Sequence, residues 1–360
     1  MTEPEIDKER EQDPEDDADD DDAVGNPDAF LVSIIACIAA LVAAEVFFRG
    51  SLLDQKLKKD SNYITAKALD YDTLGGDIVV TGDSRMFHAV IPRVMQQVLQ
   101  EKKGQTYTTY NFGIPSGTTP TFLMVASEAV HHKPRPKVFI IGLNPASFSC
   151  CDTVSAVGTS AGVHWNMVPW LVRATWRDNL EEAGASVAYG ASRLLAARTE
   201  LAYAMSIFSL PTPQLVFQER GWISLGGRVN PEVQDIRAVG RAGAYADLMD
   251  KSQGASLKPM VPRFLELTLE LLKRAGIKPV VIGAPQARQL DYFHDAAHTY
   301  FEYLNEVKRI TTEQNVPFYD LNAPPGIESA DFTDGDHLSE PGANVFTKYL
   351  AAEVVAPLLP

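Results

Sequence analysis

Short apolar segments alternate with helical segments from residue 75 to the end of the chain, and this alternation constrains the fold most. Apolar runs bounded by turn residues predict strands, at 77–81, 106–112, 138–142, 280–283 and 316–321. Segments with helical periodicity lie at 91–102, 119–131, 260–275, 295–314 and 340–356. Such alternation predicts an α/β domain of three layers, with a mainly parallel sheet covered by helices on both faces.

Polar and glycine residues stand where three of the predicted strands end. Gly82-Asp83-Ser84 follows the first strand, Gly113 follows the second and Asn144 follows the third. In open parallel sheets, ligands bind beyond the carboxyl ends of the strands. We therefore expect these residues to gather at one edge of the sheet.

Ser84 is a candidate nucleophile, with His337 as its base. A serine hydroxyl attacks poorly unless a neighbouring group takes its proton. An imidazole with an ordinary pKa of about 6.5 can take that proton and return it. Among the seven histidines in the chain, we single out His337, which has a carboxylate, Asp334, three residues before it. His88, four residues after Ser84, could face away from the hydroxyl.

Ser84 and the acids near His337 could instead have purely structural roles. Serine is a favoured helix N-cap, so Ser84 could simply begin a helix. Asp336 and Asp331 are alternatives to Asp334, and both could be solvated acids of a loop. The acids could instead hold a metal ion, but hard cations need more oxygen ligands than this stretch offers. We expect no metal and no organic cofactor.

The chain resembles the SGNH/GDSL hydrolases through four short blocks that occur in order. These blocks are Gly82-Asp83-Ser84, Gly113, Gly142-Leu143-Asn144 and Asp334-Gly-Asp-His337. The resemblance implies a flavodoxin-like SGNH fold, with Ser84 as nucleophile, His337 as base and Asp334 as the orienting carboxylate.

The same resemblance implies an oxyanion hole. Its donors would be the backbone N–H groups of Ser84 and Gly113 and the side-chain amide of Asn144. Gly113 could also be an ordinary turn glycine, and Asn144 before Pro145 could be an ordinary turn. Arg85 stands where the family usually has leucine. Its charge could meet an anionic substrate or pair with a nearby acid.

The ending DFTDGDHLSEPGANVFTKYL is similar to membrane-anchored SGNH-like proteins that O-acetylate alginate or take part in D-alanylation of teichoic acids. This resemblance implies a serine esterase or O-acyltransferase for ester-linked acyl groups, acetyl above all. A cell-envelope polysaccharide is the implied substrate, and Ser84 would carry the acyl group. The alternative is a non-catalytic relative that binds a polymer or serves as a scaffold.

The N-terminal part differs in composition from the rest. Residues 1–28 are rich in Asp, Glu and Pro, which predicts a disordered tail. Residues 29–48 are apolar on every face, and 20 residues in a helix span about 30 Å, which predicts a single transmembrane helix. We expect 49–74 to be a linker and 75–360 to be the SGNH-like domain.

Two features of the sequence disagree about the side of the membrane on which the large domain lies. The basic residues that follow the apolar segment would place the domain in the cytoplasm by the positive-inside rule. They are Arg49, Lys56, Lys58 and Lys59. The family resemblance instead implies a domain outside the cytoplasm.

Residues 146–257 interrupt the alternation and are expected to form a helical insertion over the site. The four tryptophans lie here, at Trp165, Trp170, Trp176 and Trp222. They could line a substrate groove, but burial in the insertion's own small core is favoured. The net charge of −15 is concentrated in the N-terminal tail, and no basic patch for nucleic acid is visible.

Overall fold

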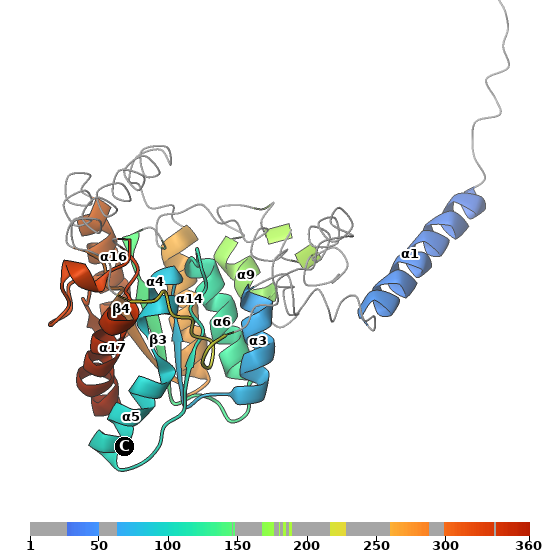
Figure 1. The fold of residues 1–360 in the computed structure, drawn as a ribbon. Helices are drawn as coiled ribbons and strands as arrows, with labels where there is room; N and C mark the ends of the chain where they lie inside the picture. The colour runs from blue at the N-terminus through green and yellow to red at the C-terminus, as the bar shows by residue number, and fades with distance from the viewer. Residues whose placement is uncertain are drawn as a thin grey trace, which may run out of the picture. The chain divides into compact units, whose positions relative to one another are not determined.

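The computed structural model describes residues 27–49, 63–145, 147, 168–175, 180, 183–184, 187–188, 217–227, 260–287, 299–334 and 336–360 (Figure 1). The chain divides into two units, Met1–Phe47 and Phe48–Pro360. The predicted acidic tail over 1–28 lies outside the described residues except for its last two positions. Most of the predicted insertion over 146–257 also lies outside them.

Within the first unit, the apolar segment forms helix α1, Pro27–Arg49. Crossing a bilayer requires a helix that is apolar over a hydrocarbon core of about 30 Å. Among the described residues, no helix is both long and apolar enough to do so. The prediction of a transmembrane helix over 29–48 is therefore not supported.

The second unit is built on a parallel sheet of five strands. They are β1 Ile78–Thr81, β2 Thr109–Asn111, β3 Val138–Leu143, β4 Lys278–Gly283 and β5 Phe318–Tyr319. The strand order is β2-β1-β3-β4-β5, and every pairing between neighbours is parallel. This order is that of flavodoxin-like folds, in which the switch point lies between β1 and β3. The prediction of an α/β domain with a mainly parallel sheet is confirmed.

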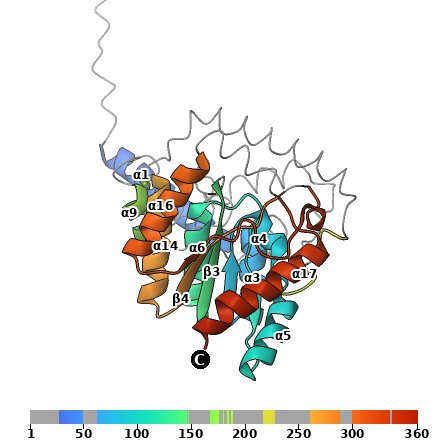
Figure 2. The same ribbon diagram turned by 90° about the vertical axis from the view of Figure 1, so that its left-hand side faces the viewer.

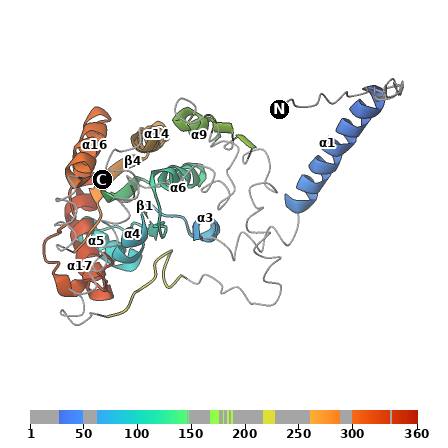
Figure 3. The same ribbon diagram turned by 90° about the horizontal axis from the view of Figure 1, so that it is seen from above.

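Helices cover both faces of the sheet, as Figures 2 and 3 show. One layer contains α3 Tyr63–Leu74, α6 Thr119–His131, α9 Val168–Thr175, α14 Met260–Arg274 and α16 Thr299–Glu313. The other contains α4 Ser84–Ala89, α5 Pro92–Lys103 and α17 Glu340–Tyr349, continued by short turns over Leu350–Val355 and Ala356–Leu358.

Strand residues alternate between the two cores that these layers create. In β3, Phe139 and Ile141 belong to the core beneath α6 and α14, whereas Val138 and Ile140 belong to the core beneath α5 and α17. All four side chains are fully buried. Burial on both faces explains why the strands read as continuous apolar runs in the sequence.

Part of the predicted linker is a helix. Residues 63–74 of the expected linker over 49–74 form α3, whose Tyr71 ring lies 5.1 Å from the ring of Tyr110 and 5.7 Å from that of Phe112. The sequence of α3 has no clear apolar stripe and includes Lys67 and two aspartates. Packing against the sheet stabilises this helix, because an isolated segment of 12 residues is marginal in water.

The described pieces of the insertion belong to the main domain. The backbone N–H of Asn111 in β2 donates to the carbonyl of Arg220 at 3.0 Å, so residues 217–227 lie along the edge of the sheet. Trp222 is buried in the core beneath α5 and α17, and its Nε1–H donates to the His88 carbonyl at 3.0 Å. Trp222 therefore packs in the core of the main domain, rather than lining a substrate groove or forming a separate core of the insertion. Trp165 and Trp176 lie outside the described residues.

The turn between β1 and α4 depends on close packing at Gly82. A Cβ at Gly82 would lie 2.7 Å from Cβ of the buried Met86 and 2.8 Å from the carbonyl oxygen of Gly142. These distances leave no room for a side chain. Gly82 therefore allows α4 to begin directly above the end of β3.

We expect Gly82→Ala to lower the free energy of unfolding by about 1–3 kcal/mol, because an added methyl in a packed core forces its neighbours to move. Gly227→Ala is the matched control, since a Cβ there meets nothing within 4 Å. Denaturant unfolding followed by circular dichroism measures both. Equal stability of the two variants would contradict the packing argument.

Candidate active site

The structure brings Ser84 and His337 together across 253 residues of sequence. Nε2 of His337 lies 2.7 Å from Oγ of Ser84. Nδ1 of the same ring lies 2.8 Å and 2.9 Å from the two carboxylate oxygens of Asp334. A carboxylate can only accept, so Nδ1 carries the hydrogen. In the neutral ring Nε2 is then the acceptor for the Ser84 hydroxyl, which is the arrangement of a nucleophile, base and orienting acid.

The short helix α4 positions Ser84. Asp83 is the N-cap of this helix, and its Oδ1 accepts from the N–H of Arg85 at 3.0 Å. Ser84 is the first residue within the helix, so the N-cap reading of this serine is wrong. The capping function belongs to Asp83, which leaves the Ser84 hydroxyl available to His337.

Contacts between α17 and α4 hold His337 in place. Ser339 caps α17 two residues after His337, and its hydroxyl donates to the Asp331 carbonyl at 2.9 Å. Within α17, the Thr347 hydroxyl donates to the Ala89 carbonyl and accepts from the N–H of Ile91, both at 3.0 Å. The loop with the imidazole is therefore fixed to the end of the helix that carries the serine.

The remaining acids of this loop are not solvated, contrary to one expectation from the sequence. Asp336 is buried, and its Oδ1 lies 3.1 Å from Nδ1 of His337. Asp331 is also buried, and it accepts from the N–H of Glu328 at 2.9 Å in a capping box of the turn Ser329–Asp331. Asp336 thus faces the imidazole, while Asp331 shapes the backbone before it.

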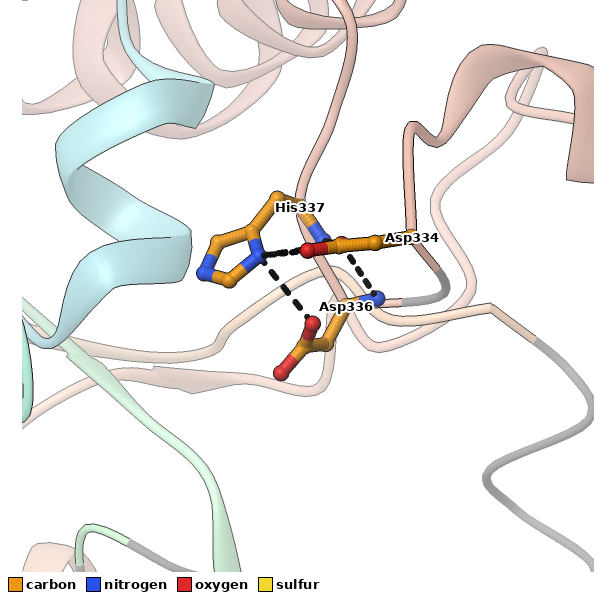
Figure 4. A group of neighbouring side chains, drawn as sticks. All are labelled: Asp334, Asp336 and His337. Carbon is orange, nitrogen blue, oxygen red and sulfur yellow. Dashed lines mark hydrogen bonds and ion pairs between the residues drawn. The ribbon is translucent and has the colours of Figure 1, made fainter. Parts of the chain in front are cut away.

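Figure 4 shows both carboxylates, Asp334 and Asp336, on the same side of the His337 ring. Burial alone lowers the pKa of His337 by disfavouring the charged ring. Hydrogen bonds to Asp334 and Asp336 and the charges of these acids outweigh burial and raise the pKa to about 9. The ring is therefore mainly protonated at neutral pH.

Two of the three expected oxyanion donors have partners within the protein. The N–H of Gly113 donates to Oδ1 of Asn111 at 2.9 Å. The side-chain amide of Asn144 donates to Oδ2 of Asp83 at 2.6 Å. Among the described residues, Asp83 engages one hydrogen of the Asn144 amide, which carries two, whereas Gly113 can serve an oxyanion only by sharing its hydrogen or releasing Asn111.

Gly113 is fixed by close packing, whereas Asn144 caps the turn that follows β3, as its turn reading from the sequence expects. A Cβ at Gly113 would lie 2.5 Å from the backbone nitrogen of Phe87, so the glycine permits β2 to approach α4. Asn144 is fully buried, and its Oδ1 accepts from the N–H of Ser147 at 3.0 Å. Both positions are fixed by packing beside Ser84.

His88 lies at the site, although the sequence analysis allowed that it could face away from Ser84. Its ring is edge-on to the His337 ring, with centroids 5.5 Å apart. Its Nδ1–H donates to the Ile223 carbonyl at 2.9 Å, and burial lowers its pKa to about 4. A spacing of four residues on a helix places Ser84 and His88 on the same side. The spacing therefore indicates that His88 lies near Ser84.

Lys67 is a second residue that the sequence gave no reason to select. It is fully buried, and its ammonium donates to the carbonyls of Asn111 at 2.9 Å and Gly113 at 2.6 Å. It also lies 3.9 Å from the centre of the Phe87 ring. Burial holds the pKa of Lys67 well below its usual value. Lys67 thus secures the backbone that leads to Gly113.

The geometry of the acids around His337 gives little support to a metal site. Among the described residues, Asp334, Asp336 and His337 offer donor atoms within 4.8 Å of one another. The distances of 2.8–3.1 Å between Nδ1 and the carboxylates suit N–H···O bonds. A hard cation needs about six oxygen ligands, so we interpret the group as hydrogen-bonded.

No protein-family model matches the chain, and no curated protein matches it. Solved structures similar to it include TesA, at 11% identity with a TM-score of 0.37, covering 78% of this chain and 99% of that chain. A lipase/acylhydrolase from Enterococcus faecalis overlaps at 14% identity with a TM-score of 0.35, covering 79% and 97%.

A lipolytic protein of the G-D-S-L family from Desulfitobacterium hafniense DCB-2 overlaps at 11% identity with a TM-score of 0.34, covering 78% and 98%. The name of the Desulfitobacterium hafniense protein includes the G-D-S-L family, which the four sequence blocks also suggest. With all three TM-scores below 0.5, we draw no conclusion about activity from the overlaps. The side chains around Ser84 provide the basis for the proposal that follows.

We expect histidine NMR to show two displaced titrations. The ring of His337 should titrate near pH 9, because two acids favour its charged form, and that of His88 near pH 4, because burial disfavours it. His337→Gln and His88→Gln assign the two signals. Titration of both rings near pH 6.5 would contradict the electrostatic description of the site.

Proposed function

We propose that the chain is a serine esterase or O-acyltransferase of the SGNH type, which forms an acyl-enzyme on Ser84. One observation carries the proposal: Oγ of Ser84 lies 2.7 Å from Nε2 of His337, whose other nitrogen meets a carboxylate. Ser84 follows β1 and Asn144 follows β3. They stand at the switch point, where flavodoxin-like sheets bind their ligands.

In the first half of the reaction, Oγ of Ser84 attacks the acyl carbon of an ester. The hydroxyl proton passes to Nε2 of His337, and the carbonyl oxygen takes up negative charge. His337 then gives the proton to the departing alkoxide oxygen as the bond from carbon to that oxygen breaks. The alcohol leaves, and the acyl group remains on Ser84.

In the second half, an incoming hydroxyl attacks the acyl carbon on Ser84. Nε2 of His337 takes the proton of this hydroxyl, and the bond to Oγ of Ser84 breaks as the serine regains a proton. Water as the incoming group completes hydrolysis, whereas a sugar hydroxyl completes acyl transfer. Both outcomes use the same residues, so the acceptor decides between them.

The raised pKa of His337 sets the pH dependence of this chemistry. The first step requires the neutral ring, and a pKa of about 9 leaves only about one molecule in a hundred neutral at pH 7. The rate constant kcat/KM should therefore increase as pH rises towards 9. Substrate binding that lowers this pKa would move the increase to lower pH.

We propose an acetylated cell-envelope polysaccharide as substrate and a place of action outside the cytoplasm. Support for both comes from the similarity of the segment 331–350 to proteins that acylate exported polymers, with its Asp334, His337 and following Gly342-Ala343. A serine-reactive probe applied to intact and to permeabilised cells tests the location. Labelling of Ser84 only after permeabilisation would contradict it.

We expect Ser84→Ala to reduce hydrolysis of p-nitrophenyl acetate at least about 1000-fold, because no other group can then carry the acyl intermediate. Ser127→Ala is the control, since Ser127 lies on α6 in the layer opposite α4. A fluorophosphonate probe should label the wild type and Ser127→Ala but not Ser84→Ala. Unchanged turnover by Ser84→Ala would eliminate the proposed enzyme.

We expect Asn144→Ala to lower kcat about 100- to 1000-fold with a small change in KM, as loss of an oxyanion donor typically does. Steady-state kinetics at pH 9 measures the effect. A purely structural role would instead lower the melting temperature and leave kcat of the folded fraction intact. Thermal unfolding of the same preparation separates the two explanations.

A further inference from the structure

Two carboxylates approach one nitrogen of the His337 ring, and they differ in environment. Oxygens of Asp334 lie 2.8 Å and 2.9 Å from Nδ1, and the Asp334 side chain is 34% exposed. Oδ1 of Asp336 lies 3.1 Å from the same Nδ1, and its side chain is only 4% exposed. A buried acid responds less to salt and solvent than an exposed one.

The other oxygen of Asp336 faces Arg85. Oδ2 lies 3.7 Å from Nη2 of Arg85, whose side chain is 1% exposed. Burying a carboxylate costs several kcal/mol unless a counter-charge accompanies it. Arg85 supplies that charge from the position directly after the nucleophile. At 1% exposure it is too buried to meet a substrate anion, so the ion-pair reading of Arg85 from the sequence is the one that the geometry supports.

We propose that Asp336, held by Arg85, is a second positioning carboxylate for His337 and acts in parallel with Asp334. This inference rests on the proposed function of Ser84 and His337. The pair joins the turn that carries the nucleophile to the loop that carries its base. Rotation of the ring away from Ser84 would break contacts with both acids, so the second acid narrows the orientations that the imidazole adopts.

Several charged or titratable groups surround His337, and they bear on the pH dependence. The loop contributes Asp334 and Asp336, and α4 contributes Ser84, Arg85 and His88. Lys67 of α3 lowers the pKa of His88 through its charge. The two acids are the groups that favour the charged ring of His337. Removing either acid should move the rise of kcat/KM to lower pH.

The first test is Asp336→Asn, which keeps the shape and removes the charge. We expect the apparent pKa of kcat/KM to fall by about one unit or more, and the plateau kcat to fall about 10- to 100-fold with little change in KM. The loss at pH 7 should be smaller than the loss at the plateau, because more rings are neutral at pH 7. Equal losses at both pH values would overturn the proposal.

Glu340→Gln is the matched control for loss of a nearby acid. Glu340 is exposed at the start of α17 and accepts from the Ser224 hydroxyl. We expect its pH profile to match that of the wild type. A shift equal to that of Asp336→Asn would assign the effect to general charge rather than to Asp336.

A double-mutant cycle tests whether the two acids act in parallel. If each acid partly replaces the other, Asp334→Asn combined with Asp336→Asn should lose more activity than the product of the two single losses. Losses that simply multiply would show independent roles and overturn the parallel arrangement.

Arg85→Met together with Asp336→Asn provides a variant without the buried pair of Arg85 and Asp336 if Asp336→Asn alone does not fold. Removing both partners of a buried pair is better tolerated than removing one. The same downward shift of the pH profile is expected of it. An unchanged profile in this folded variant would overturn the proposal.

Failure of this inference can be told apart from failure of the proposed function. If Ser84→Ala keeps full turnover, the proposed function fails. If Ser84→Ala abolishes turnover but Asp336→Asn keeps the wild-type pH profile, only the role of Asp336 fails. Histidine NMR of Asp336→Asn gives a reading without any substrate: the titration of His337 should move to lower pH by about one unit.

Discussion

The contact between the loop before α17 and the turn after β1 is the constraint on which the site depends. His337 reaches Ser84 because α17 packs on α4 and α5, with Thr347 bonded to both Ala89 and Ile91. Backbone and side-chain bonds of Ser339 to Asp331 then fix the loop that precedes α17. A hydrogen bond of 2.7 Å between distant residues is possible only when both supports are rigid, because small displacements weaken such bonds steeply.

Buried charged side chains surround this contact and lie close to one another or to backbone carbonyls. Arg85 faces Asp336, and Asp336 faces His337. Lys67 donates to the carbonyls of Asn111 and Gly113 beneath the site. Unpaired charges in such positions would cost several kcal/mol each. Their arrangement favours a protonated imidazole, which links the electrostatics of the interior to the expected increase of activity in alkaline solution.

Local signals predicted most elements of the sheet and several of its helices. The apolar runs over β1, β3 and β4 were long enough to be identified, because strands buried on both faces consist almost entirely of apolar residues. Helix α3 was missed, since tertiary packing of Tyr71 rather than an apolar stripe stabilises it. The transmembrane prediction over 29–48 used apolar character and length, and no described helix meets the requirements for a span.

The alternation of strands and helices follows from the local order of residues, and it fixes the edge of the sheet at which Ser84 and Asn144 lie. The sequence also indicated the pairing of Ser84 with His337 and Asp334, because the spacing of three residues joins a base to an acid. The burial of Asp336 and Arg85 beside that pair became known from the three-dimensional fold, as did the position of His88 next to it and the hydrogen bond from Gly113 to Asn111. These facts depend on contacts between segments far apart in the chain, and no local pattern of residues encodes the distance between two such segments.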